Sequence, residues 1–233
     1  AYRTALAGIF GSRATTHGQI CAGACRLSSG VSGRIDRRPV SFVVGPLTAS
    51  VSEEVNVADV NLGPLSGVAI RDVNGNPDEH DESIYPGLDD DRFTVLRSHD
   101  GLQGVYVNRP QLLSPSGSDF QLMPHRRVMN LGNDALRLFF LRRLYAPILV
   151  SRETGFILET EALEIEAGAL GILRSLLLAK PKARAVQFAL SRTDNLLSSK
   201  LLCGDMRIVP LSYPEAISLT VGFLNPALQV RAV

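Results

Sequence analysis

The last part of the chain alternates between large apolar and small or polar residues, with the period of two that β-strands show. Within residues 216–223 this alternation places four large apolar side chains on one face: Ile217, Leu219, Val221 and Phe223. A shorter apolar run at 206–211 precedes it, and a turn that contains Pro214 separates the two runs. The pattern predicts two strands, the second with one face on a core and a free edge available to another chain.

A helical period dominates residues 126–145. One polar stripe at 4-3-4 spacing is formed by Arg126, Asn130, Asn133 and Arg137. Nearly all other positions in this segment are apolar, so we expect a helix that is buried on most of its circumference.

A second helix is predicted for residues 157–179, with glutamates in its first half and a Lys-Pro pair at its end. Gly168 and Gly171 lie in its interior, where glycine lowers helix stability, so we expect them to permit close approach of another backbone. A strand follows at 185–191. The second half is therefore predicted to be an α-α-β-β-β unit with a partly antiparallel sheet.

The first half of the chain shows shorter and weaker patterns. Helices are predicted at 2–13, 19–27 and 55–62, and short buried strands at 40–44 and 68–73. Asp100-Gly101 suits the turn of a hairpin between 93–96 and 104–107. Alternating helices and short apolar strands indicate an α/β layer, so the fold class is predicted to be mixed, α+β or α/β.

The segment 72–91 carries eight carboxylates and no Lys or Arg, which predicts an exposed acidic loop. Its start, DVNGNPD, is similar to a calcium-binding loop. An EF-hand loop needs Gly at its sixth position and Glu at its twelfth, and these places hold Pro77 and Ser83. An EF-hand site is therefore not predicted.

A loop rich in Pro, Ser and Gly at 110–122 indicates a boundary between two domains. We place them at 1–115, an α/β layer domain, and at 116–233, a domain of a helix pair plus a sheet. Because the chain opens with Ala1 inside a predicted helix and without a Met, we expect the first domain to lack N-terminal sequence.

Composition excludes several classes of protein. The chain has 233 residues, of which 45% are hydrophobic and 20% charged, which argues against wholesale disorder. A net charge of +1 does not favour nucleic acid as a direct partner. No run of about 18 apolar residues exists, so no membrane insertion is expected. Although His17, Cys21 and Cys25 share a four-residue spacing, no further Cys/His cluster completes a zinc site, and buried thiols are the favoured interpretation.

Motifs for catalysis are missing from the sequence. The four histidines are His17, His80, His99 and His125, and no Gly-x-Ser-x-Gly elbow accompanies them. Neither glycine-rich phosphate-binding motif occurs. The pairs Glu159/Glu161 and Glu164/Glu166 are two residues apart, so their members do not face each other on a helix. We predict no catalytic, cofactor-binding or metal-binding residues and no cofactor.

What remains is a segregation of charge. Acidic residues gather at 72–91 and 159–166, and basic residues gather at 126–143 and 180–207. Complementary patches on one chain are typical of head-to-tail self-assembly. The alternatives are that the charges only solubilise the protein, or that it is an α/β, hydrolase-like enzyme with an unrecognised site near His99 and His125.

Residues 105–224 resemble the C-terminal part of contractile tail sheath proteins. The resemblance rests on RRVMNLGNDALRLFFLRRL, on AGALG at 167–171, on the strand at 185–191, and on RTDNLLSSKLLCGDMRIVPL followed by PEAISLTVGF. It implies a structural subunit without enzymatic activity, which assembles with copies of itself into stacked hexameric rings around a tail tube protein. Contraction then drives the tube through a cell envelope.

The resemblance also implies a location and a means of linkage. A sheath subunit is part of a virion, the phage tail, and is assembled in the cytoplasm of the host bacterium. Family members join neighbours through terminal arms that add strands to a sheet in the next subunit. Only Leu224 and the nine residues NPALQVRAV follow the last predicted strand here.

Overall fold

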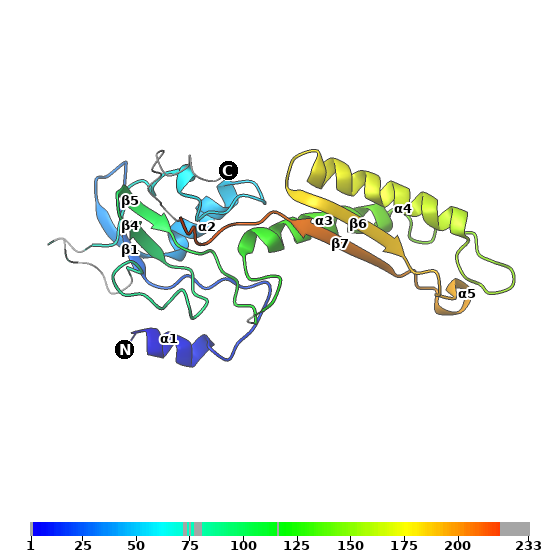
Figure 1. Cartoon of the computed structure of the whole chain (residues 1–233), viewed down its shortest axis with the longest axis horizontal. Helices are drawn as coiled ribbons and strands as arrows, with labels where there is room; N and C mark the ends of the chain where they lie inside the picture. The colour runs from blue at the N-terminus through cyan, green and yellow to red at the C-terminus, as the bar shows by residue number, and fades with distance from the viewer. Residues whose placement is uncertain (1, 72–73, 75, 77–80, 116, 220–233) are drawn as a thin grey trace, which may run out of the picture.

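The computed structural model describes residues 2–71, 74, 76, 81–115 and 117–219, which form two lobes along the long axis of the molecule (Figure 1). The fold is α+β, which confirms the predicted class. The N-terminal lobe contains α1 (Tyr2–Phe10), β1 (Ala24–Ser28), β2 (Ile35–Pro39), α2 (Ser41–Ser50), η1 (Val60–Leu62), β3 (Val68–Ala69), β4 (Leu96–His99) and β5 (Leu102–Val107). The C-terminal lobe contains α3 (Met123–Leu141), α4 (Glu159–Leu173), η2 (Arg174–Leu178), β6 (Ala183–Leu190), α5 (Leu196–Ser199) and β7 (Gly204–Pro210).

Two small antiparallel sheets build the N-terminal lobe. One has the order β2-β1-β3, and the other is the β4–β5 hairpin, which contains the predicted Asp100-Gly101 turn. Gly101 has φ +80°, a value that favours glycine, and this part of the prediction is confirmed. A buried cluster joins the two sheets to α2 through Cys25, Val40, Val44, Val57, Ile70, Leu96, Val105 and Val107.

The prediction of a strand at 40–44 is wrong, because helix α2 begins at Ser41. A run with four apolar residues in five fits a strand as well as a helix, and the helix forms here because it directs two pairs of side chains to the core. Val40 and Val44 are buried, and Val43 and Leu47 pack beside them, which is a helical spacing. Pro46 lies inside this helix and did not end it.

Of the other predictions for the N-terminal lobe, one is confirmed, one is wrong and two are confirmed only in part. The helix at 19–27 is wrong, since this segment forms the central strand β1 and pairs with β2 and β3. Of the helix at 55–62 only the 3-10 turn η1 forms, and of the strand at 68–73 only β3, with residues 72 and 73 outside the described part. The first helix is confirmed as α1, although it ends at Phe10.

The acidic segment is not simply an exposed loop. Asp81 is fully buried and Glu82 is 7% exposed. Asp81 Oδ1 accepts a hydrogen bond from the Ser83 amide (3.0 Å), and Glu82 Oε1 accepts one from the Gly87 amide (2.6 Å). These two carboxylates therefore shape a turn against the lobe, because a buried charge needs hydrogen-bond donors. His80 and its neighbours 77–79 lie outside the described residues.

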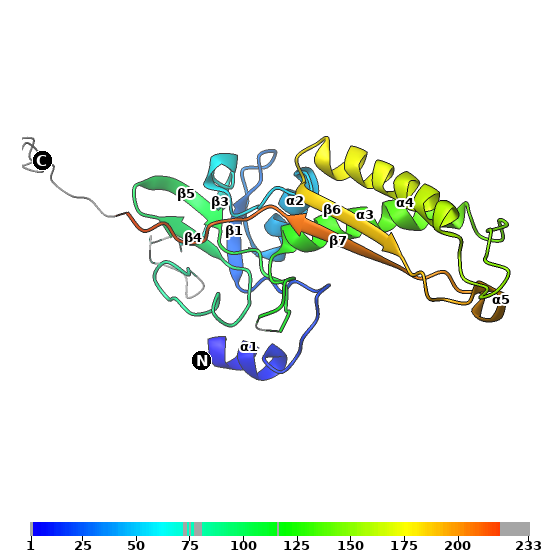
Figure 2. The same cartoon turned by 45° about the vertical axis from the view of Figure 1, so that its right-hand side comes forward.

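The C-terminal lobe has two layers, a helical layer and a β-ribbon (Figures 1 and 2). β6 pairs antiparallel with β7, α4 packs on β6, and α3 packs on β7. The core is a single cluster that includes Val128, Leu136, Ile165, Leu173, Leu177, Val186 and Phe188. The two predicted helices and the strand at 185–191 are thereby confirmed.

Two predictions for this lobe need correction. Helix α3 buries one face only, with Val128 and Leu136 inward, while Leu138 is 61% exposed. Helix α3 packs on one side of a two-stranded ribbon, so among the described residues the face of α3 away from the ribbon, which includes Leu138, is exposed. The strand predicted at 216–223 is not formed at 216–219, where the chain is irregular, and 220–223 lie outside the described residues.

Candidate functional site

The β6–β7 ribbon has open edges, as the two N-terminal sheets do, and its strands are the longest of those described. Among the described strands, each of these two pairs only with the other. Inward-facing residues of β6 are buried, whereas Met206 and Ile208 on β7 are only half-buried. An edge strand presents unpaired backbone groups that can pair with another chain. The ribbon therefore offers two strand-addition sites, and the β7 side leaves more apolar surface uncovered.

An ion-pair network holds the end of this ribbon on α4. Arg192, just after β6, pairs with Glu166 (2.7 Å) and Glu159 (2.8 Å). Glu166 also accepts a hydrogen bond from the Leu190 amide (2.6 Å). These bonds, above all the one from Arg192, lower the pKa of Glu166 and keep it ionised although it is only 9% exposed. The network fixes where β6 ends relative to α4.

The segment after β7 continues in the direction of that strand and runs along the N-terminal lobe (Figure 2). The Leu211 carbonyl lies 2.9 Å from His125 Nε2, and Glu215 pairs with Arg109 (2.7 Å). Beyond this point Ile217 is 77% exposed and Leu219 is 81% exposed. Ile217 and Leu219 lie two and four positions after Glu215, and these two large apolar side chains face solvent, where they are available to a partner.

Much of the charge that the sequence segregates is used inside the molecule. Arg127 donates to the carbonyls of Val51 and Ser52, Arg143 lies over the Phe139 ring (3.9 Å), and Lys182 pairs with Glu53. The basic clusters at 126–143 and 180–207 are therefore only partly a free surface. The remaining exposed cations in them include Arg137, Arg142 and Arg184.

The histidines and cysteines do not come together. His99 lies against the Tyr106 ring (5.4 Å), and His125 lies against Tyr213 (5.4 Å), on different lobes. Burial raises the pKa of Cys21 to about 11, so this thiol is not a ready nucleophile. Within the described ranges, no three His, Cys, Asp or Glu side chains are placed to hold a metal ion. The spacing of His17, Cys21 and Cys25 reflected no helix, because β1 contains Cys25.

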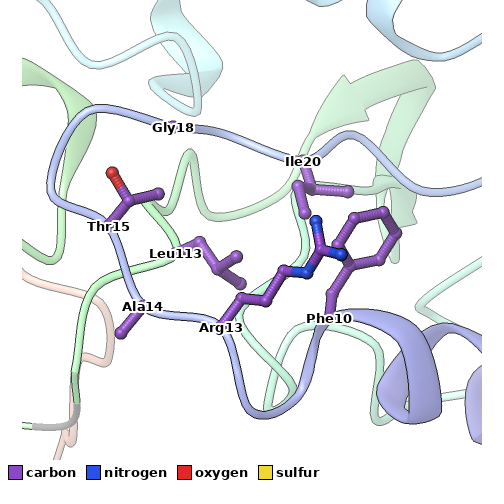
Figure 3. Close-up of a pocket in the computed structure, with 7 residues that line it drawn as sticks. All are labelled: Phe10, Arg13, Ala14, Thr15, Gly18, Ile20 and Leu113. Carbon is purple, nitrogen blue, oxygen red and sulfur yellow. The ribbon is translucent and has the colours of Figure 1, made fainter.

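Two surface cavities are candidates for the substrate site of an enzyme. The first, of about 500 Å³, lies between α1 and the following segment and is lined by Phe10, Arg13, Ala14, Thr15, Gly18, Ile20 and Leu113 (Figure 3). Its walls are mostly apolar, and Arg13 lies 5.7 Å from the Phe10 ring. The second, of about 510 Å³, lies beside Arg92 and Gln111. Thr15 lines the first cavity, and Asp90 and Ser114 line the second, but neither cavity is lined by a histidine or a cysteine. Neither therefore places a histidine beside a nucleophile, as a Ser–His or Cys–His hydrolase does.

No model of a known protein family matches the chain, and no curated protein matches its sequence. Solved structures do match its fold. One is the sheath of an extracellular contractile injection system, PVC, in its contracted state, with a TM-score of 0.66 and 13% identity over 98% of this chain and 62% of that chain. Another is the helical sheath of the anti-feeding prophage (AFP), also contracted, with a TM-score of 0.60 and 14% identity over 91% and 57% of the two chains.

At such low identity, the likeness concerns the fold. The α+β chain described here has the fold of contractile sheath proteins, which confirms the resemblance in its sequence. The chain spans about three-fifths of the length of these neighbours, 62% and 57%. Among its described helices, none is both long enough and apolar enough to span a bilayer.

Proposed function

We propose that this chain is a structural subunit of a contractile tail sheath. It assembles with copies of itself into stacked hexameric rings around a tail tube protein, and contraction drives the tube through a cell envelope. The observation that carries the proposal is the fold shared with two contracted sheaths across more than nine-tenths of the chain. The particle is a phage tail or a related injection machine, assembled in the bacterial cytoplasm.

The β6–β7 ribbon gives this proposal a physical mechanism. A strand from a neighbouring subunit adds to an open edge by main-chain hydrogen bonds, and alternate side chains enter the apolar surface beside it. Met206 and Ile208 supply part of that surface. The exposed Ile217 and Leu219, with the alternation that continues in the sequence to Phe223, supply a strand that can be donated.

Electron microscopy of negatively stained full-length protein tests the proposal. We expect tubes or stacked rings, and monodisperse monomers across a range of salt concentrations would contradict it. Leu219→Pro is the sharpest variant, because proline removes a backbone donor and cannot continue a ladder. It should abolish assembly without changing the melting temperature of the monomer, since Leu219 is exposed. Ser212→Ala, at an exposed position before this strand, is the matched control.

We also propose that the boundary near residues 115 and 116 separates two domains. The buried clusters support this division, because two of them lie within residues 22–107 and the third lies within 128–190. Limited proteolysis that cuts first within 114–122 is the expected result. Initial cleavage inside α3 or β6 would argue against the boundary.

A further inference from the structure

The two lobes are joined by polar contacts and not by a shared hydrophobic core. Each buried cluster that the described residues form belongs to one lobe, and the main contacts between helices and strands also stay within a lobe. Lobes of one chain move relative to each other unless a large apolar interface prevents it. The relative orientation of the two lobes must therefore be held by specific polar contacts.

Arg126 contacts His17, and Glu215 pairs with Arg109, but several of the polar groups converge on one short turn of the N-terminal lobe, residues 51–54, directly after α2. Arg127 on α3 donates to the Val51 carbonyl (2.8 Å) and to the Ser52 carbonyl (3.2 Å). These carbonyls directly follow α2, so the guanidinium lies near the C-terminal end of that helix, where a cation interacts favourably with the helix dipole. Tyr213, in the segment after β7, donates its hydroxyl to the Glu54 carbonyl. Three of the four residues in this turn, Val51, Ser52 and Glu54, are thus held by two separate segments.

Lys182 is the remaining contact, and it differs from the others because it is buried. The residue is 8% exposed, and its ammonium group pairs with Glu53 and lies 3.8 Å from Glu54. The Ser52 hydroxyl donates to Glu54 (2.6 Å) and so keeps this carboxylate in place. A buried lysine needs a carboxylate partner, and both of its partners here come from the other lobe. The bond to Lys182 also lowers the pKa of Glu53 and keeps it ionised.

We propose that Lys182 holds the two lobes in one orientation through its interactions with Glu53 and Glu54 in the turn 51–54. We call this set of interactions the lock. Without its charge the turn keeps only the hydrogen bonds from Arg127 and Tyr213, and the C-terminal lobe pivots about the connections at 114–122 and 211–213. The lock is a property of the single chain and does not depend on the proposed assembly. In a sheath subunit it would make the two lobes move together.

Distance measurements between spin labels on the two lobes test the lock. Cys203 is an exposed native site on the C-terminal lobe, and Val31→Cys supplies a fully exposed site on the N-terminal lobe, with Cys21→Ala to prevent side labelling. With Lys182 intact, the labels at positions 31 and 203 should give one narrow distance distribution. Lys182→Met, which keeps the length of the side chain and removes its charge, should broaden it roughly twofold. Arg184→Met, at an exposed position two residues later on β6, should leave it unchanged.

Amide hydrogen exchange distinguishes loss of the Lys182 interactions from unfolding of the C-terminal lobe. In Lys182→Met the amides of 51–54 should lose protection by about tenfold while those of β6 and β7 keep theirs. If that variant fails to fold, the double change Glu53→Gln with Glu54→Gln removes the partners from the other side of the joint. The proposal would be overturned if a folded variant, either Lys182→Met or Glu53→Gln with Glu54→Gln, gave a distance distribution as narrow as that of the labelled protein with Lys182 intact.

Discussion

The C-terminal lobe is built from long elements, and the N-terminal lobe from short ones. Helix α3 has 19 residues and α4 has 15, and both pack on one ribbon around a single core. The strands of the N-terminal lobe have two to six residues, and its core is divided into two clusters. Its interior also contains polar residues, such as Thr94 and Gln111.

This difference shows how the two lobes are stabilised. In the C-terminal lobe, local helical contacts and one apolar layer are sufficient. In the N-terminal lobe, segments far apart in sequence are tied by hydrogen bonds: Gln19 donates to Thr94 (2.8 Å), and Arg92 donates to the Ser114 carbonyl (2.7 Å) and to that of Gly11 (2.9 Å). Helix α1 has no buried residue; Leu6 and Phe10 pack against the cluster that contains Phe93, and Arg3 pairs with Asp91. The N-terminal lobe should therefore be the more fragile one.

The largest expected effects come from the two cores. Phe93→Ala in the N-terminal lobe should cost about 3–5 kcal/mol and Leu173→Ala in the C-terminal lobe about 2–5 kcal/mol, since both side chains are fully buried. Hydrogen exchange in increasing urea, followed lobe by lobe, measures each effect where it occurs. Each change should lower the unfolding midpoint of its own lobe most.

Leu149→Ala is the control, because this leucine is 63% exposed and should change stability by less than about 0.5 kcal/mol. Equal losses in both lobes from either core variant would mean that the protein unfolds as one cooperative unit. That outcome would remove the contrast between the lobes.

The next largest effect concerns the ion-pair network of the C-terminal lobe. Glu166→Gln should cost roughly 1–3 kcal/mol, because it weakens the bonds to Arg192 and to the Leu190 amide at a buried position. Thermal unfolding measures the loss. Glu164→Gln, two positions earlier on the exposed side of α4, is the matched control and should be nearly neutral. A similar loss in both variants would show that the network adds nothing of its own.

The same network predicts a pH dependence. The folded-state pKa of Glu166 lies below its usual value of 4.5, so folding favours the ionised form. Its contribution is fully present above the unfolded pKa and is lost as the pH falls through the folded pKa. The stability difference between the wild type and Glu166→Gln should therefore be constant from pH 7 to about 5 and shrink below that range. A difference that grows on acidification would contradict this assignment.

The elements that the sequence predicts well are those whose pattern is local. The helix expected at 126–145 is α3, and the strand expected at 185–191 is β6, because a helical or alternating period is visible within one segment. In contrast, the run at 40–44 is apolar at every position but Ser41, so its pattern does not separate a strand from a helix. Its helical state is decided by distant partners, among them the Gly23 carbonyl that accepts a bond from the Val40 amide (3.2 Å).

The candidate site follows the same rule. The alternation that marks Ile217 and Leu219 is visible in the sequence, and the structure leaves both exposed. Glu159 and Glu166 are seven residues apart and share a helix face, a signal that pairs two residues apart do not have. Lys182 and Glu53 are separated by 129 positions, and nothing local connects them. The contacts between lobes were therefore beyond the reach of sequence patterns.

The smallest expected effect corrects the prediction for the two glycines of α4. A Cβ on Gly168 would lie 3.0 Å from the Phe139 ring, so close approach there involves a side chain, whereas a Cβ on Gly171 would meet nothing within 4 Å. Gly171→Ala should therefore raise the free energy of unfolding by about 0.5–1 kcal/mol, because alanine loses less backbone entropy in a helix. Gly168→Ala should gain less or lose stability, since Phe139 must shift. Chemical denaturation of both variants compares them directly. If Gly171→Ala proved destabilising, the open side of α4 would have to be in contact with another part of the protein or with another copy.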